Sequence, residues 1–123
     1  MRPFTHPAAG SITLEGILHA LSDPERMAMY VCLLNAGAAQ SCVNFQRIND
    51  RTVPKSTLSQ HFRVLREAGL IRSERHGVEV LNTSRRAEID KLFPGLINAL
   101  ATAYRRQSGK STLARKPGRP ARA

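Results

Sequence analysis

The sequence predicts a mainly α-helical fold that carries one β-hairpin. Residues 54–68 have the apolar spacing of a single amphipathic helix, with Leu58, Phe62 and Leu65 on its buried face. Two short alternating runs follow this helix directly and meet near Gly77, which supplies the backbone freedom of a tight turn. A helix with a polar outer face, followed at once by a β-hairpin, is the arrangement of a winged helix-turn-helix domain.

The predicted organisation is a single domain between two disordered ends, because 123 residues suffice for one small core. We expect a disordered N-terminus over residues 1–11, a winged helix-turn-helix domain with dimerisation helices over 12–106, and a basic disordered tail over 107–123. The net charge is +10, and the chain from Arg105 onward holds seven Lys or Arg residues and no acid. A protein with this charge favours polyanionic partners, which are DNA, RNA or an anionic membrane, and the helix-turn-helix pattern favours double-stranded DNA among them.

The lack of long apolar runs and the small number of cysteines indicate the compartment and the redox state. No apolar run approaches the length of a transmembrane helix and no signal peptide is visible, so we expect a cytoplasmic protein with no membrane partner. The two cysteines, Cys32 and Cys42, are too few for a disulfide scaffold. We expect Cys32 to be a small buried side chain in a helix. Cys42 lies near the start of a predicted helix and could be the reactive thiol of a redox sensor.

Three helices are predicted before the polar-faced helix. The first covers about 12–21. The second begins in Ser22-Asp23-Pro24-Glu25, where Ser22 and Glu25 match a capping box and Pro24 suits the first turn. It ends near Gly37, which accepts left-handed backbone angles. A third short helix covers 42–48, with Phe45 and Ile48 facing inward.

The remaining elements follow the turn at residues 49–54. The fourth helix, at about 54–68, stops at Gly69, and the hairpin strands at 70–74 and 78–82 flank the turn at 75–77. A last helix is expected from about 87 to 106, with a kink or a late start at Pro94.

Three segments, taken in order, resemble those of the ArsR family of winged-helix repressors. They are ALSDPERMAMYVCLL in the second helix, KSTLSQHFRVLREAGLI in the fourth helix and RSERHGVEVLN in the hairpin. The resemblance covers roughly residues 12–104. It implies a homodimer that binds an operator near its own promoter and leaves the DNA when an inducer, here a possible small molecule, binds.

The resemblance, together with the chemistry of the side chains, implies which residues meet DNA. The first half of a recognition helix reaches base edges in the major groove, which here gives Ser56, Thr57, Ser59 and Gln60. Gln60 can pair with an adenine edge, and the Thr57 methyl can touch a thymine methyl. Lys55 and Arg63 suit phosphates. His61 stands at the family's histidine position, where it either contacts DNA or packs at the edge of the core.

The hairpin, at about 70–82, is the predicted wing. Arg72, Arg75 and His76 would lie along the adjacent DNA backbone or minor groove. The alternative is a plain charged hairpin, which Glu74 and Glu79 favour.

Apolar residues on the first and last helices exceed what one small domain easily covers. The family pairs these helices across a two-fold axis, which implies an interface formed by Leu14, Ile17, Leu18, Leu96, Ile97, Leu100 and Tyr104. The alternative is that both helices belong only to the core of one chain. Metal-sensing members carry a Cys-x-Cys in the third helix or an Asp/His cluster in the last. Here Cys42 has no second thiol and the last helix has Glu88 and Asp90 but no histidine, so we expect no metal site and no cofactor.

These residues favour a sequence-specific DNA-binding repressor as the leading prediction. The alternative is a weakly specific architectural protein of the nucleoid type that uses its basic tail, in which residues 116–122 resemble an AT-hook although Pro117 replaces the usual arginine. An RNA-binding module is disfavoured by the scarcity of aromatic side chains. An enzyme is not expected, because no nucleophile–base arrangement and no Gly-rich phosphate loop is present.

Overall fold

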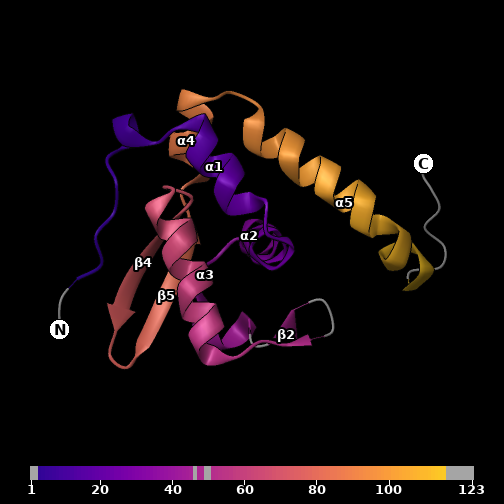
Figure 1. Ribbon diagram of the computed structural model, residues 1–123, viewed down its shortest axis with the longest axis horizontal. Coiled ribbons are helices and arrows are strands. Elements are labelled where there is room, and N and C mark those ends of the chain that lie inside the picture. The colour runs from indigo at the N-terminus through magenta and orange to yellow at the C-terminus, as the bar shows by residue number, and fades with distance from the viewer. Residues whose placement is uncertain (1–2, 46, 49–50, 116–123) are drawn as a thin grey trace.

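Helices and one small sheet enclose a single apolar core in the computed structural model, which describes residues 3–45, 47–48 and 51–115 (Figure 1). Strand order in the three-stranded antiparallel sheet is β1-β5-β4, and β2 pairs with β3 in a separate ladder. The elements in chain order are η1 (Ala9–Ser11), α1 (Leu14–Leu21), α2 (Pro24–Ala36), β1 (Gln40–Ser41), η2 (Cys42–Phe45), β2 (Arg47–Ile48), β3 (Arg51–Thr52), α3 (Lys55–Glu67), β4 (Ile71–His76), β5 (Glu79–Ser84), α4 (Arg86–Leu92) and α5 (Leu96–Arg115). The mainly α-helical fold with a β-hairpin wing is confirmed.

The core lies between α1, α2, α3 and the sheet. Leu58, Phe62 and Leu65 of α3 are buried in it, as the apolar spacing predicts. Gly69 closes the end of α3 with a φ of +86°, and Ile12 packs over it. A Cβ atom at Gly69 would lie 2.5 Å from Ile12 Cγ1, so both the backbone angle and the close approach require glycine.

The predicted start of α2 is correct in position, but its cap is a different residue. Asp23 is the N-cap, and its Oδ1 accepts hydrogen bonds from the N–H groups of Glu25 (2.8 Å) and Arg26 (3.1 Å). Ser22 instead donates its hydroxyl to the carbonyl of His19. The expected capping box is therefore wrong, and the carboxylate of Glu25 is left to interact elsewhere. The predicted end is confirmed, since Gly37 has a φ of +69°.

The third predicted helix is shorter than expected. A single 3-10 turn, η2, replaces it, and the chain then forms the two-residue strands β2 and β3, with Ile48 paired to Arg51. Phe45 and Ile48 are buried, as expected. The Phe45 and Phe62 rings meet edge to face at 5.5 Å between centroids, which fixes η2 against α3.

The wing is longer than predicted. Its strands pair from Ile71 with Ser84 down to His76 with Glu79, so the loop is only two residues, Gly77 and Val78. Gly77 has a φ of +66°, as its role in a tight turn requires.

The last predicted helix is two helices. The chain breaks between α4 and α5 around Pro94, and Gly95 takes a φ of +84° there. Helix α5 then continues to Arg115, so residues 107–115 are helical where disorder was expected. Figure 1 shows the second half of α5 extending beyond the body of the domain. The predicted AT-hook segment at 116–122 lies outside the described residues.

The beginning of the chain also departs from expectation, because residues 3–11 follow a defined course. Residues 3–8, which we call the N-terminal arm, run beside the edge strand β4 (Figure 1). The Ser73 N–H donates to His6 Nε2 at 3.0 Å, and Arg85 donates to the carbonyl of Pro7 at 2.8 Å. These two bonds hold the arm at the base of the wing. Within the described part of the chain, no helix is both long and apolar enough to cross a membrane.

Candidate nucleic-acid interface

The outer face of α3 carries the polar side chains that the sequence assigns to DNA. Leu58, Phe62 and Leu65 point inward, which leaves the opposite side of the helix to solvent. Thr57 is half-buried, and the structure brings together as exposed neighbours Lys55, Ser56, Ser59, Gln60 and Arg63. A major groove admits one α-helix, and short side chains near its N-terminus let the backbone approach the base edges.

Two of these side chains are already in contact. Arg63 donates to Gln60 Oε1 at 3.2 Å. The Gln60 oxygen has two lone pairs, so it can accept from Arg63 and still has one acceptor position available. The two side chains thus form one polar unit on the exposed face of α3.

His61 lies away from this face and is buried, so the prediction that it contacts DNA is corrected. Its side chain is only 7% exposed and lies between α3 and the start of α2. Nε2 is 2.8 Å from Glu25 Oε1, and Nδ1 is 3.3 Å from Arg26 NH1. Arginine can only donate, so in the neutral ring Nδ1 accepts and Nε2 donates to Glu25. The alternative of packing at the edge of the core is the one that the structure supports.

Glu25 links this histidine to the β2–β3 ladder. Its second oxygen, Oε2, lies 2.8 Å from Arg51 NH1, as an ion pair whose geometry does not meet that of a hydrogen bond. Asp23, Glu25 and His61 place one ligand atom each within 4.8 Å of one another. The guanidinium groups of Arg26 and Arg51 already supply positive charge to this cluster, and the neutral imidazole is used at both nitrogens. The cluster connects α2, α3 and the β2–β3 ladder through hydrogen bonds and an ion pair.

The charge on Asp23 supports the same interpretation. Burial alone would raise the pKa of Asp23, but hydrogen bonds from the backbone of Arg26 and Glu25 outweigh it and hold the pKa below its ordinary 3.8. The carboxylate thus stays charged as a helix cap at the positive end of α2.

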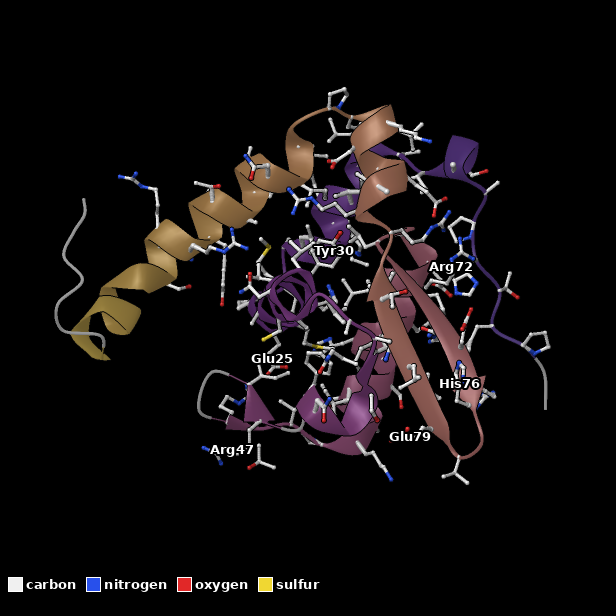
Figure 2. All side chains as sticks on the ribbon, turned by 180° about the vertical axis from the view of Figure 1, so that it is seen from behind. Glu25, Tyr30, Arg47, Arg72, His76 and Glu79 are labelled. Atoms are coloured by element: carbon white, nitrogen blue, oxygen red, sulfur yellow. The ribbon has the colours of Figure 1, made fainter. Side chains whose placement is uncertain are left out.

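Arg72 lies at the base of the wing, next to the body of the domain (Figure 2), and its side chain is partly exposed. Its NH2 lies 3.4 Å from Glu88 Oε2 on α4, and the buried Arg85 binds the same carboxylate at 2.7 Å. The hydrogen bond from Arg85 is the main reason that the pKa of Glu88 is lowered to about 2. The charge of Arg72 is thus partly neutralised by an ion pair within the domain.

The outer half of the wing carries the other two predicted contacts. Arg75 and His76 are both exposed on β4, and His76 Nε2 lies 3.3 Å from Glu74 Oε1. Figure 2 shows His76 on β4 near the N-terminal arm. The Arg75 guanidinium lies over the Phe4 ring of that arm, 4.5 Å from its centroid. The structure therefore brings Arg75 and Phe4 together, which the sequence does not indicate.

The predicted dimer surface is divided between solvent and core. Leu14 and Leu18 are 41% and 46% exposed on α1, whereas Ile17 and Ile97 are 0% and 1% exposed and belong to the core of one chain. These two isoleucines are corrected from interface to core. The half-buried members of the predicted set lie on α5 and pack against the core with one side: Leu96, Leu100 and Tyr104.

Of the two cysteines, the structure describes the side chain of Cys32. Cys32 is exposed on α2, which corrects the expectation that it is buried. Partial desolvation still raises the pKa of its thiol, so it carries less thiolate than a free cysteine. The side chain of Cys42 lies outside what the structure describes, and its redox role stays a prediction.

Sequence reasoning missed several cationic and anchoring side chains. Arg47 and Arg51 are exposed on the β2–β3 ladder beside the start of α3, and Figure 2 labels Arg47 there. Their two positive charges stand just before α3 in the sequence and could have been used to predict that they lie beside it. Phe4 and His6 gave none, because their contacts span more than sixty residues of chain.

Comparison with known proteins agrees with this geometry. A family model described as a helix-turn-helix domain matches residues 21–74. The HTH-type transcriptional repressor SmtB of Mycobacterium tuberculosis, from two strains, is 37% identical over 65 residues, which is 53% of this chain and 45% of that protein. The chain thus spans about half the length of the curated relatives that it matches.

Two solved structures share the fold. The transcriptional repressor BigR from Xylella fastidiosa is 25% identical, with a TM-score of 0.56 over 74% of this chain and 85% of that one. An ArsR-like transcriptional regulator from Rhodococcus sp. RHA1 is 26% identical, with a TM-score of 0.53 over 82% of this chain and 92% of that one.

Proposed function

We propose that this chain is a member of the ArsR family of winged helix-turn-helix regulators and acts as a dimeric repressor that binds a specific site on double-stranded DNA. The observation that carries the proposal is the polar outer face of α3, whose exposed side chains from Lys55 to Arg63 suit bases or phosphates. Both the SmtB relatives and BigR are described as transcriptional repressors, which supports the same regulatory role here.

In the proposed complex, α3 lies in the major groove with its N-terminal half toward the bases. Ser56, Thr57, Ser59 and Gln60 read base edges, while Lys55 and Arg63 bind the flanking phosphates. Phosphate contacts supply affinity and position, and base contacts supply discrimination. The wing would extend along the neighbouring backbone through Arg75 and His76, with Arg72 closer to the body.

The proposed dimer uses the exposed leucines of α1 and the outer side of α5. Leu14 and Leu18 expose apolar surface that one chain does not cover, and Leu92 at the end of α4 adds to it. A two-fold dimer would place two copies of α3 on the same side, as successive half-sites of an operator require.

The experiment that tests the proposal separates the two kinds of contact. We expect Gln60→Ala to weaken binding to the preferred site by about 1–3 kcal/mol while leaving random DNA nearly unchanged. Lys55→Ala should weaken binding to both by similar factors. Equal losses on specific and random DNA for both variants would contradict the assigned roles.

A second function, weakly specific architectural binding, is favoured by the charge distribution. The chain from Arg105 onward holds seven Lys or Arg residues and no acidic residue. This charge alone can give sequence-independent affinity for DNA. Removal of residues 107–123 separates the two functions. A repressor keeps its preference for the operator after removal, whereas an architectural protein loses most of its affinity for any DNA.

A further inference from the structure

The N-terminal arm lies where the recognition helix and the wing face each other. A cleft beside the arm is lined by Phe4 and His6 from the arm, by Arg63, Arg66 and the acidic Glu67 from α3, and by Arg75 from β4, so three cations face one carboxylate. Arg63 belongs to the outer face of α3, so the cleft continues the surface that we assign to DNA. The arm is therefore a third segment at this surface, besides the helix and the wing.

Phe4 is the centre of this contact. The Arg66 and Arg75 guanidinium carbons lie 4.3 Å and 4.5 Å from the centroid of its ring. Arg66 is held from the other direction, because its NH1 donates to Ser73 Oγ at 3.1 Å. Arg75 is exposed, and the stacking on Phe4 is the contact that orients its guanidinium. A guanidinium stacked on a ring keeps its N–H groups at the rim, where a phosphate can accept from them.

We propose that the arm is a working part of the DNA-binding surface, in which Phe4 positions Arg75 for a DNA phosphate and His6 fastens the arm to the wing. The proposal rests on the proposed function, because the phosphate belongs to the DNA. Phe4 and His6 are positioning residues here and act through Arg75.

The fastening by His6 requires a neutral imidazole. Nε2 accepts a hydrogen bond from the Ser73 N–H, and a protonated ring has no acceptor to offer. Burial and the charges of Arg72, Arg66 and Arg85 lower the pKa of His6, against a smaller opposing effect of Glu74. These charges come from every element that packs on the ring: α3, β4 and the residue before α4. The arm should therefore stay docked at neutral pH and be released only as the pH falls through the lowered pKa of His6.

The first test compares variants of the full chain by fluorescence anisotropy on one DNA fragment across a salt series. We expect Phe4→Ala to weaken binding about two- to five-fold, on specific and random DNA alike, since an exposed cation–π contact has that worth. The slope of log affinity against log salt should fall by about 0.9, the value of one phosphate contact. Phe4→Trp should restore both quantities, and Ser11→Ala, an exposed residue outside the arm, should change neither.

The second test uses pH. As the pH is lowered from about 7.5 through the lowered pKa of His6, the loss caused by Phe4→Ala should shrink in the wild-type background, because protonation of His6 releases the arm. In a His6→Gln background the loss should stay constant, since a glutamine oxygen accepts the Ser73 bond without titrating. A structural role of Phe4 alone would move neither the salt slope nor this pH dependence.

Each outcome decides between the proposals. If the wild-type chain binds DNA but Phe4→Ala binds equally well or more tightly, the positioning role is overturned, and tighter binding would mean that the arm blocks the surface. If the wild-type chain binds no DNA at any salt concentration, the proposed function itself fails. Thermal unfolding of each variant, measured alongside, shows whether a loss of binding follows from a loss of fold.

Discussion

His61 of α3 and Glu25 of α2 face each other across the helix-turn-helix, with 2.8 Å between Nε2 and Oε1. The contact joins the recognition helix to the first turn of the helix that supports it. Arg51, paired with the other oxygen of Glu25, extends the connection to the β2–β3 ladder. The orientation of α3 thus depends on buried polar contacts as well as on apolar packing.

The first prediction concerns this contact. We expect His61→Ala to lower the free energy of unfolding by about 1–3 kcal/mol, because the largely buried carboxylate of Glu25 loses its hydrogen-bonded partner. Urea denaturation measures the change. Lys55→Ala, an exposed residue of the same helix, is the control and should be nearly neutral. A His61→Ala protein as stable as wild type would show that the contact contributes nothing to the fold.

The second prediction concerns Gly69. Gly69→Ala should destabilise the domain by about 2–4 kcal/mol, because it combines a left-handed backbone angle with a clash against Ile12. Gly77→Ala is the matched control: its φ is also positive, but nothing lies within 4 Å of the added Cβ. We expect only about 1 kcal/mol there. Equal losses at the two glycines would mean that Ile12 moves aside at no cost.

The third prediction concerns acid stability. The folded-state pKa of Glu88 is about 2, below its ordinary 4.5, so its ion pairs with Arg85 and Arg72 stabilise the fold fully above pH 4.5. That stabilisation is lost as the pH falls from 4.5 toward 2. Glu88→Gln should therefore flatten the dependence of unfolding free energy on pH within this range. An unchanged pH profile would indicate that solvent screens the half-exposed carboxylate.

The fourth prediction concerns the dimer. Leu14→Glu and Leu18→Glu should shift the chain to a monomer in sedimentation at micromolar concentration, because each places a charge on a surface proposed to be buried between copies. Val78→Glu, at the fully exposed tip of the wing, should leave the oligomeric state unchanged. A wild-type chain that sediments as a monomer would itself contradict the dimer.

Sequence reasoning predicted the elements whose signal is local. The amphipathic spacing of α3, the turn at Gly77 and the end of α2 at Gly37 each depend on residues close in the chain, and all three are confirmed. The same locality gives the outer face of α3, on which the resemblance to the family places the residues proposed to read bases, Ser56, Thr57, Ser59 and Gln60.

Contacts between distant segments were not predictable in this way. The orientation of His61 depends on Glu25, 36 residues away, and that of Arg75 depends on Phe4. The cap of α2 was misassigned because Ser22 and Asp23 are both good caps and only the backbone path selects one. Ile17 and Ile97 could not be separated from Leu14 and Leu18 by sequence, because apolar core and apolar interface have the same pattern.

Sequence-specific DNA binding is the central claim, and one measurement tests it most directly. Fluorescence anisotropy would compare the DNA upstream of the gene for this chain with a scrambled copy, across a salt series. We predict a preference of about a thousandfold or more for one sequence, as specific regulators show. Equal and steeply salt-dependent binding to both, together with no enriched sequence in a selection from genomic fragments, would contradict the account and leave a weakly specific architectural protein.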